Sequence, residues 1–456
     1  MTASTARANP LSFPRLALGR LRAILSVGSV LVVMSVLIVT YYVAVLEGFR
    51  NLSFVTVGVA FLLGTDGLLL VFTAGRRPPS VTQKPAVLQP DVSVIIACYN
   101  GTEVIGETLE HLLVHVAPEN VIVVSDCSTD DTASVARSFG VRVVENRFNR
   151  NKALSVSRVA PMLTTPYTLI LDDDTLVGTE ALPVELLDDG AAGVAFDVMP
   201  IQTGTIINRM QTYEYRKSMT LGKALLSDVG AVANISGAVG LFRTADLRRQ
   251  ASRHSGHFPG EDLQRTLLAH LESEGRGVAF SSNRVVTMVP GSWSELFAQR
   301  SIKWGPAEHE LLFLNLRLLL DPRTHYALRY ERGYSIFVLL TDPVRMLFFV
   351  TLLLSPAYFV FVYLLYLPLE LAAWLRLGRR DPFRVVLLAP LYNLFKLVAR
   401  FRAHFHWFLI KWKYLFTHRY HRLVADRNLP VEYAGVITVL AVAWMVTVSQ
   451  VLARVG

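Results

Sequence analysis

The chain has 456 residues, of which 52% are hydrophobic, and its mean hydropathy is +0.39. This length exceeds what one core usually serves, and this hydropathy is unusual for a protein without membrane segments, so we expect a membrane region beside a polar domain. Lys and Arg outnumber Asp and Glu by 45 to 36, which gives a net charge of +9. Because basic and aromatic residues are not interleaved as in a nucleic-acid module, we assign this excess to the cytoplasmic face of a membrane and expect no nucleic-acid partner.

The first 90 residues predict a basic terminus, two spans and a linker. Residues 1–22 are basic and contain no acid, which predicts a cytosolic segment. The segment 23–77 is apolar enough for two transmembrane helices, and the two arginines near its end place the following residues in the cytoplasm. A signal peptide does not fit, because the first apolar run is too long and no small-residue cleavage site follows it. Residues 78–90, rich in Pro, Gln and Thr, have the composition of a linker.

Residues 91–306 have the pattern of a soluble α/β domain. Strand-like apolar segments alternate there with segments of helical spacing, in the order 92–97, 103–115, 120–126, 131–139, 141–144, 152–163 and 167–171. This alternation predicts βαβ units and a mostly parallel sheet that helices cover on both faces. Ligands of such sheets bind beyond the carboxyl ends of the strands, where Asn100, Asp126 and the aspartates at 172–174 fall. We therefore expect one site at that edge.

The segment 167–175 is the strongest single signal in this domain. It is an apolar, β-prone strand that ends in Asp172, Asp173 and Asp174. Three like charges repel one another, and a hard divalent cation that bridges a diphosphate would neutralise them. Asp172 and Asp174 share one face of an extended segment, as such a site requires. The alternative is an acidic loop in which Asp174 or Thr175 caps the next helix.

Residues 307–456 predict interfacial helices and about three transmembrane helices. The apolar segment 334–377 fits either one tilted helix after an interfacial segment or two spans, and we favour two. The segment 383–410 mixes apolar and basic residues, which favours a helix on the membrane surface over a pore-lining helix. The segment 434–452 predicts a last span. We therefore expect a multi-pass protein of the cell (inner or plasma) membrane, with its polar domain in the cytoplasm and membrane lipids as partners.

Short polar segments of the domain follow one another in a recognisable order. They are 97–100 (A-C-Y-N), 124–132 (V-S-D-C-S-T-D-D-T), 149–153 (N-R-N-K-A), 172–174 (D-D-D), 236–243 (S-G-A-V-G-L-F-R), 260–262 (G-E-D) and 299–304 (Q-R-S-I-K-W). In this order they resemble the motifs of family 2 glycosyltransferases, in the membrane-embedded branch that includes hyaluronan, chitin and cellulose synthases. The resemblance extends over residues 91–306 and implies a GT-A-like (Rossmann-like) α/β domain that transfers sugar from a nucleotide sugar with inversion.

The resemblance implies a donor site for a UDP-linked sugar. Tyr99 and Asn100 end the first strand, and Asp126 matches the acid that holds the uracil ring. A carboxylate suits that role because it accepts from the uracil imide without donating back. Lys152 matches the lysine near the diphosphate or base, and Asp172 contacts the ribose or a metal ion.

Three residues of the donor motifs depart from the family pattern. Ser125 and Cys127 stand where the family has Asp and Gly, which we expect to alter the base contact. Asn151 replaces a glycine before Lys152, so we expect the local turn to differ. The serine and the acid that follow Cys127 also suit capping of the next helix.

The resemblance also implies a metal ion and a general base. Asp174, with Asp172 as a possible second ligand, would hold Mg²⁺ or Mn²⁺ against the diphosphate. Asp262, beside Glu261, would take the proton of the acceptor hydroxyl as it attacks the anomeric carbon. Two acids that complement a helix amino terminus are the alternative reading of this pair.

The acceptor side is implied by two segments. Ser236 and Gly237 match a segment of small residues that lets the acceptor approach the backbone, although a plain turn before a strand fits as well. The segment 299–304 matches the Q-x-x-R-W signature of processive synthases imperfectly, because Arg300 and Lys303 replace Gln and Arg in strict register. Lys keeps the charge but loses the planar fork of Arg. Trp304 would stack on the acceptor sugar at a channel mouth, or anchor the chain at the interface.

These inferences predict a membrane-bound glycosyltransferase that builds, and extrudes, a polysaccharide. The alternative is transfer of one sugar to a lipid acceptor or lipid carrier, which uses the same donor site and needs no aromatic collar at Trp304. A transporter or scaffold with a relict domain would not need Asp126, Asp174 and Asp262 in this order. The sequence identifies no accessory subunit.

Overall fold

The computed structural model describes residues 85–254, 260–273 and 276–415, with a few positions between 28 and 61. The basic terminus at 1–22, most of the two spans expected within 23–77, and the last span at 434–452 lie outside the described residues.

One eight-stranded sheet forms the centre of residues 85–304, which we call the sheet half, in the order β3-β2-β1-β4-β7-β6-β8-β5. The strands are β1 (Val92–Cys98), β2 (Val121–Ser125), β3 (Arg142–Glu145), β4 (Tyr167–Asp172), β5 (Thr175–Val177), β6 (Gly193–Pro200), β7 (Val239–Arg243) and β8 (Val278–Thr287).

The first half of the sheet is the expected βαβ arrangement. β3, β2, β1 and β4 run parallel and alternate along the chain with α4 (Ile105–Leu112), α5 (Thr132–Ser138) and α6 (Asn151–Val159). β1 is apolar along its length because helices cover both of its faces. Ile95 and Ile96 point to opposite faces and are both 0% exposed. Truncating either residue to Ala therefore costs about 2–5 kcal/mol of stability.

The second half of the sheet corrects the expectation of a mostly parallel sheet. β7 is antiparallel to β4 and β6, and β5 is antiparallel to β8, whereas β6 and β8 are parallel. Parallel neighbours need a crossover of about a dozen residues or more. Only Asp173 and Asp174 separate β4 from β5, so this connection leaves no room for a crossover and β5 pairs with β8 instead.

Shorter helices lie between the strands and between the last strand and the carboxy-terminal part. They are η1 (Pro118–Asn120), η2 (Ala160–Met162), α7 (Glu185–Asp188), α8 (Ile206–Arg216), η3 (Lys217–Lys223), α9 (Ala224–Leu226), η4 (Ser227–Val229), α10 (Thr244–Arg253), α11 (Glu261–Glu272), α12 (Trp293–Ala298), η5 (Gln299–Trp304), α13 (Gly305–Glu310) and α14 (Leu312–Leu320). α8 begins where Thr205 Oγ1 accepts a 3.3 Å hydrogen bond from Asn208 N. η3 and η5 are π-helical, a conformation that is frequent at functional sites.

Three long helices end the described chain: α15 (Tyr326–Leu354), α16 (Pro356–Arg376) and α17 (Phe383–Leu415). The apolar segment 334–377 is thus split between two helices at Ser355, because Pro356 lacks an N–H and suits the first helical position. Among the described helices, α16 is the one that is long and apolar enough to cross a membrane. α15 carries a fully buried Asp342–Arg345 ion pair.

α17 covers the segment expected to lie on the membrane surface. It packs against α16, η5 and α13. Two of its basic side chains pair with acids inside the protein, Lys396 with Glu214 at 3.3 Å and Arg400 with Asp342 at 2.6 Å. These two basic side chains therefore face acids of the protein.

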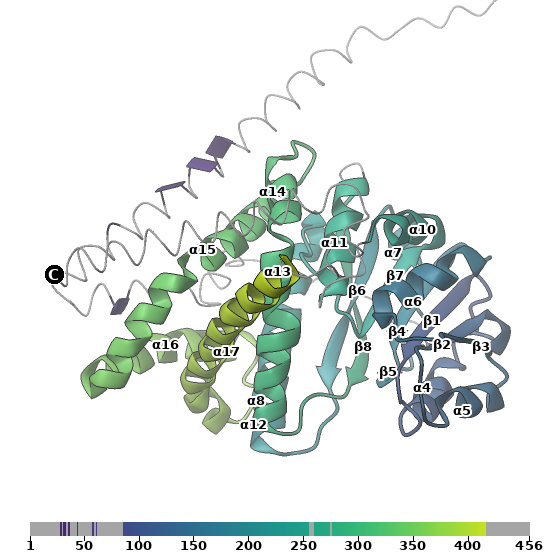
Figure 1. The fold of residues 1–456 in the computed structure, drawn as a ribbon, viewed down its shortest axis with the longest axis horizontal. Helices are drawn as coiled ribbons and strands as arrows, with labels where there is room; N and C mark the ends of the chain where they lie inside the picture. Colours follow the sequence, from purple (N-terminus) through teal and green to yellow (C-terminus); the bar gives the residue numbers. More distant parts are fainter. Residues whose placement is uncertain are drawn as a thin grey trace, which may run out of the picture.

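Buried ion pairs join the sheet half to the long helices. Lys217 Nζ lies 2.9 Å from Glu370 of α16, and Arg216 Nε lies 3.0 Å from Asp381, just before α17. In Figure 1 the sheet lies on one side and α15, α16 and α17 on the other, with α8, α12 and α13 between them. The helix formed by α8 and η3 is therefore a direct connection between the two halves.

Candidate active site

The loops after β1 and β2 are held together by reciprocal hydrogen bonds. Asn100 N donates to Ser128 Oγ at 3.1 Å, and Thr129 N donates to Asn100 Oδ1 at 2.9 Å. Thr102 N donates to Asp130 Oδ2 at 3.2 Å, so this acid joins the two loops. Tyr99 is 55% exposed above them. These hydrogen bonds fix the two loops relative to each other at the carboxyl edge of the sheet.

Asp126 is buried at this edge, with 4% of the residue exposed. Its Oδ1 accepts hydrogen bonds from Asn146 Nδ2 at 2.6 Å and from Arg150 N at 2.8 Å. Within the described part of the chain, no donor is bonded to its Oδ2. The carboxylate is thus held through one oxygen, and its second oxygen has the capacity to accept from a ligand.

Two residues that replace family glycines keep the glycine conformation. Cys127 has φ +64° and Asn151 has φ +67°. Asn151 therefore adopts the left-handed region that a glycine reaches without strain, and Asn tolerates this region well. Cys127 pays a larger conformational cost there, since its Cβ meets the following carbonyl oxygen.

The three aspartates after β4 are crowded and half-buried. Burial raises the pKa of Asp172, Asp173 and Asp174, and the charges of neighbouring aspartates raise it further. Lys152 Nζ forms an ion pair with Asp172 Oδ1 and opposes this shift. Asp174 Oδ1 accepts a 3.1 Å hydrogen bond from Thr287 Oγ1 of β8, which orients it. The cluster therefore carries more negative charge than its protein neighbours neutralise.

The donor set fits a divalent metal that binds together with its substrate. The described residues contain no group of three or more His, Cys, Asp or Glu side chains able to hold a metal ion by themselves. Mg²⁺ is commonly held by one or two carboxylates and substrate phosphates, with water completing its shell. Asp174 and Asp172 supply such a partial set, and a divalent cation held there would favour their ionised forms against the burial that raises their pKa.

Gly237 connects the predicted base to the predicted donor site. Its N–H donates to Asp262 Oδ2 at 3.0 Å, and its carbonyl oxygen accepts from Lys152 Nζ. Lys152 also lies 3.7 Å from Glu261 Oε1. A Cβ at Gly237 would lie 3.6 Å from the Asp262 side chain, which is an ordinary van der Waals contact, so these two hydrogen bonds do not by themselves require a glycine. The structure thus brings Lys152, Asp172, Gly237, Glu261 and Asp262 together.

The two acids at the start of α11 differ in their electrostatics. Burial and the charge of Glu261 raise the pKa of Asp262. For Glu261, burial acts in the same direction, but Lys152 and Arg265 outweigh it and lower the pKa. Environments that push two pKa values apart are typical of an acid–base site. Asp262, with the raised pKa, is the better proton acceptor of the two.

The whole segment 299–304 forms the π-helical turn η5. Arg300 is buried, pairs with Glu214 at 2.7 Å and stacks on Trp304 with 3.6 Å between its Cζ and the ring centroid. Lys396 and the Tyr392 hydroxyl, at 3.3 Å and 2.8 Å, also bind this glutamate, and the cations lower the pKa of Glu214 to about 2. Lys303 is exposed and does not join Arg300 and Trp304.

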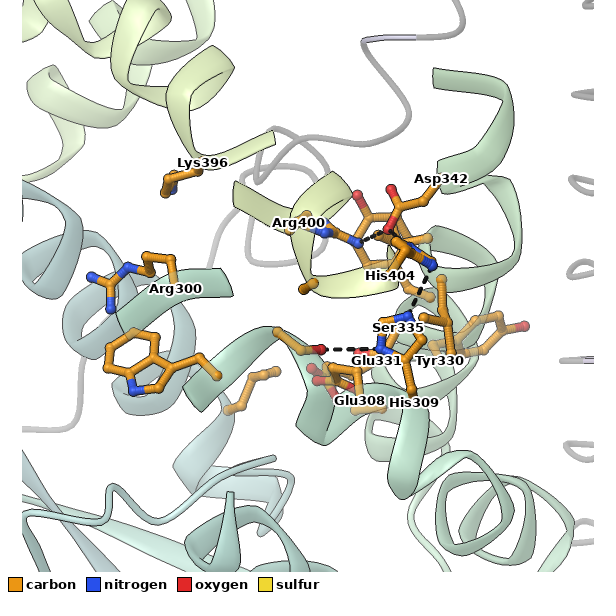
Figure 2. Close-up of a pocket in the computed structure, with 18 of the residues that line it drawn as sticks. Arg300, Glu308, His309, Tyr330, Glu331, Ser335, Asp342, Lys396, Arg400 and His404 are labelled. Atoms are coloured by element: carbon orange, nitrogen blue, oxygen red, sulfur yellow. Dashed lines mark hydrogen bonds and ion pairs between the residues drawn. The ribbon is translucent and has the colours of Figure 1, made fainter. Parts of the chain in front are cut away.

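A cavity of about 610 Å³ lies between η5, α13, α15 and α17. Arg300 and Lys396 lie on one side of it in Figure 2, and His309, His404 and Asp342 on the other. These three form a chain, with 2.9 Å between His309 Nε2 and His404 Nδ1 and 3.0 Å between His404 Nε2 and Asp342 Oδ2. Trp304, which is 46% exposed, also lines this space. The size is that of a small-molecule site.

Three buried charged residues of this region were not predicted. Arg265 follows Glu261 by four residues on α11, and this helical spacing is a signal that sequence reasoning missed. Glu214 and Lys223 lie in a segment without a recognised motif. Lys223 Nζ donates to Ser236 Oγ at 2.7 Å, a pairing across the fold that no local spacing reveals.

The chain is similar to known glycosyltransferases. Residues 93–247 match the model of glycosyl transferase family 2. The chain is 26% identical over 262 residues to a poly-beta-1,6-N-acetyl-D-glucosamine synthase of Staphylococcus epidermidis, covering 54% of this chain and 61% of that protein. It is 24% identical over 309 residues to the synthase of the same name from Staphylococcus aureus strain COL, covering 64% of this chain and 73% of that one.

One solved structure to which the chain is similar is that of the mannosyltransferase PcManGT from Pyrobaculum calidifontis, in complex with GDP-Man and Mn²⁺. It aligns with a TM-score of 0.45 at 15% identity, covering 82% of this chain and 99% of that chain.

The family match and the relatives agree on the class of enzyme. Residues 93–247 match a glycosyl transferase family 2 domain, and the relatives named above are synthases of a poly-N-acetylglucosamine. Its similarity spans 61% of the length of the Staphylococcus epidermidis relative.

Proposed function

Because residues 93–247 match a glycosyl transferase family 2 domain, we propose that this protein is a membrane-bound, inverting enzyme that builds a polysaccharide from a UDP-linked sugar. The relatives named above are synthases of a poly-N-acetylglucosamine, so UDP-N-acetylglucosamine is the donor of first choice. The apolar helix α16 and the hydropathy of the chain support attachment to a membrane. The catalytic domain faces the cytoplasm, where nucleotide sugars are made.

The position of Gly237 is the observation that carries this proposal. A single residue binds Asp262 through its N–H and Lys152 through its carbonyl oxygen. Lys152 in turn pairs with Asp172 at the end of β4. A base for the acceptor and a cation for the donor phosphates are therefore fixed relative to each other, which is what an in-line displacement at the anomeric carbon requires.

In the proposed reaction the acceptor oxygen bonds to the anomeric carbon while the bond from that carbon to the phosphate oxygen breaks. Asp262 takes the hydroxyl proton, and the diphosphate leaves with the electron pair. Lys152 places positive charge beside the departing phosphates. A divalent metal bound at Asp174 and Asp172 supplies charge neutralisation of the leaving group. Attack from the face opposite the leaving group inverts the anomeric centre.

The cavity beside Trp304 supports a glycan acceptor. An exposed indole ring stacks well on a sugar face, and Arg300 holds this ring from the other side. Tyr330 and Ser335 add hydroxyl groups, and Glu308 adds a carboxylate, all of which bond to sugar hydroxyls. A growing chain would therefore extend from Asp262 past Trp304 into this cavity.

Transfer of one sugar to a lipid acceptor is the second candidate. The same cavity is also lined by apolar residues of α15, Val338 and Leu339, and by the cations Lys396 and Arg400. An apolar wall with adjacent cations suits the phosphate and the acyl chain of a lipid carrier. The two candidates share the donor site and differ in what fills this cavity.

The test uses the purified full-length protein in liposomes with Mn²⁺ or Mg²⁺ and radiolabelled UDP- and GDP-sugars. Products are extracted into organic solvent and sized. A long, aqueous, glycosidase-sensitive product from UDP-N-acetylglucosamine is the expected result. A single labelled lipid would replace the first candidate by the second. No product from any donor, with sugar and lipid primers supplied, would overturn both.

A further inference from the structure

Lys223 is a buried lysine at the acceptor side of the site that no motif explains. It is the last residue of η3 and is 9% exposed. Its Nζ donates to Ser236 Oγ at 2.7 Å, in the segment that also contains Gly237. A buried ammonium group destabilises the fold, because a hydrogen bond to one neutral hydroxyl compensates only part of its desolvation. A hydrocarbon side chain would fill this position at lower cost.

We propose that Lys223 is a positioning residue for the acceptor: it fixes Ser236 as a hydrogen-bond donor to the acceptor sugar and places positive charge beside Asp262. This inference rests on the proposed function and adds to it a residue that sets acceptor binding. The orientation of Ser236 follows from hydrogen bonding, and the effect on Asp262 follows from charge.

The hydrogen bond to Ser236 has a fixed direction. An ammonium group donates three hydrogen bonds and accepts none, so Ser236 Oγ must be the acceptor in this pair. The single Ser236 O–H is then left to donate elsewhere. In the described part of the chain, no second side chain or backbone group is bonded to Ser236 Oγ. Ser236 lines a small pocket together with Gly237 and Asp262, so its half-buried hydroxyl keeps a proton for a ligand at this place.

The charge of Lys223 acts on the predicted base. The carboxylates that favour its charged form are Asp262 of α11 and Asp197 of β6. Coulomb interactions are mutual, so a protonated Lys223 also favours the ionised form of Asp262. Burial opposes these carboxylates and lowers the pKa of Lys223 to about 8. Lys223 is therefore largely protonated at neutral pH and loses its proton as the pH rises through about 8.

A purely structural role for Lys223 predicts something different. Lys217 provides the comparison, because it begins the same π-helical segment, is 8% exposed and pairs with Glu370 at 2.9 Å. Lys217 faces α16 and not the acceptor segment. Loss of Lys217 should affect stability, whereas loss of Lys223 should affect the acceptor kinetics and their pH dependence.

The experiment measures kcat and KM for acceptor and donor between pH 6 and 10, using full-length Lys223→Met, Lys223→Arg, Ser236→Ala and Lys217→Met. We expect wild-type kcat/KM for the acceptor to fall above about pH 8. Lys223→Met should raise the acceptor KM at pH 7 about 10-fold, more than the donor KM, and should lack the alkaline fall. Lys223→Arg should restore acceptor binding and move the fall beyond pH 9, since Arg stays charged.

The double variant Lys223→Met/Ser236→Ala tests whether the two residues act as one unit. We expect its acceptor KM to match that of the worse single variant, because the second change removes an interaction already lost. Lys217→Met should keep the alkaline fall. Multiplicative effects in the double variant, or an unchanged alkaline fall in a folded Lys223→Met, would overturn the proposal. If Lys223→Met does not fold, the Lys223→Arg profile and Ser236→Ala decide. Inactive wild-type protein would count against the proposed function instead.

Discussion

The sheet half (residues 85–304) and the long-helix half (residues 305–415) of this protein differ in how their buried acids are paired with cations. At the edge of the sheet, Asp172, Asp173 and Asp174 remain crowded, with burial raising the pKa of each. Between the helices, Lys217 is paired with Glu370 and Arg345 with Asp342. A site must keep charge available for its ligand, whereas a scaffold must satisfy every charge that it buries. Among the described residues, the three aspartates at the edge of the sheet share one cation, Lys152, whereas Glu370 and Asp342 each have a cation of their own.

The largest effect that this comparison predicts is on a scaffold pair. Lys217→Met leaves the Glu370 carboxylate buried without its cation and should lower the free energy of unfolding by about 3–5 kcal/mol. Asn393, which donates to Glu370 Oε1 at 2.7 Å, cannot replace the lost charge. Denaturant titration in detergent measures this change.

The matched control is the double variant Lys217→Met/Glu370→Met. Replacing both partners by apolar residues removes the unpaired charge, so most of the stability should return. If the double variant is as unstable as Lys217→Met, packing and not charge explains the loss, and the comparison fails for this pair.

On the site side, we expect Asp174→Asn to lower activity about 10- to 100-fold at limiting metal and to raise the Mn²⁺ concentration for half-maximal activity. Asp174 is the aspartate that Thr287 orients, so its loss removes a preset ligand. Titration of activity with Mn²⁺ measures the effect. Asp173→Asn is the control, because its backbone carbonyl oxygen bonds Thr108 and its side chain lies near Cys98. An equal metal shift in both variants would contradict the assignment of Asp174.

The smallest effect concerns the strained backbone at Cys127. Cys127→Gly relieves the left-handed conformation, worth about 1–2 kcal/mol, but adds about 0.5–1 kcal/mol of unfolded-state entropy. We therefore expect a net stabilisation of about 0.5 kcal/mol. Thermal unfolding measures it, with Cys127→Ala as the control that keeps the strain. Destabilisation by the glycine would show that the Cys127 side chain makes contacts worth more than the strain.

The same comparison explains how much was predictable from the sequence. Asn100, Asp126 and Asp172 lie at or just after the carboxyl ends of apolar strands. Parallel strands bring these ends to one edge, so the local pattern was enough to group the three residues. The mixed half of the sheet was not predicted, because β7 enters between β4 and β6 after a long helical excursion.

The scaffold pairs were out of reach for a different reason. Lys217 and Glu370 are separated by 153 residues, and no periodicity connects them. The basic residues of α17 suggested a membrane surface, whereas Lys396 and Arg400 meet Glu214 and Asp342 inside the protein. Charge composition indicates that a helix is basic, but only the tertiary packing decides which acid it meets.

The central claim is that Asp262 is the catalytic base. Asp262→Asn tests it through two measurements, the rate of sugar transfer from UDP-N-acetylglucosamine and the free energy of unfolding. We expect the rate to fall and the free energy of unfolding not to fall. Because the folded-state pKa of Asp262 is raised, its ionised form is disfavoured in the folded protein, and its contribution to stability falls as the pH rises through that pKa. At pH 7 the neutral Asn removes this cost.

We therefore predict that Asp262→Asn lowers kcat about 100- to 10,000-fold while the protein stays at least as stable as wild type at pH 7. Glu272→Gln, at the other end of α11, is the control and should leave kcat within about twofold. A kcat of Asp262→Asn within tenfold of wild type, or a loss of activity that only follows unfolding, would contradict the account.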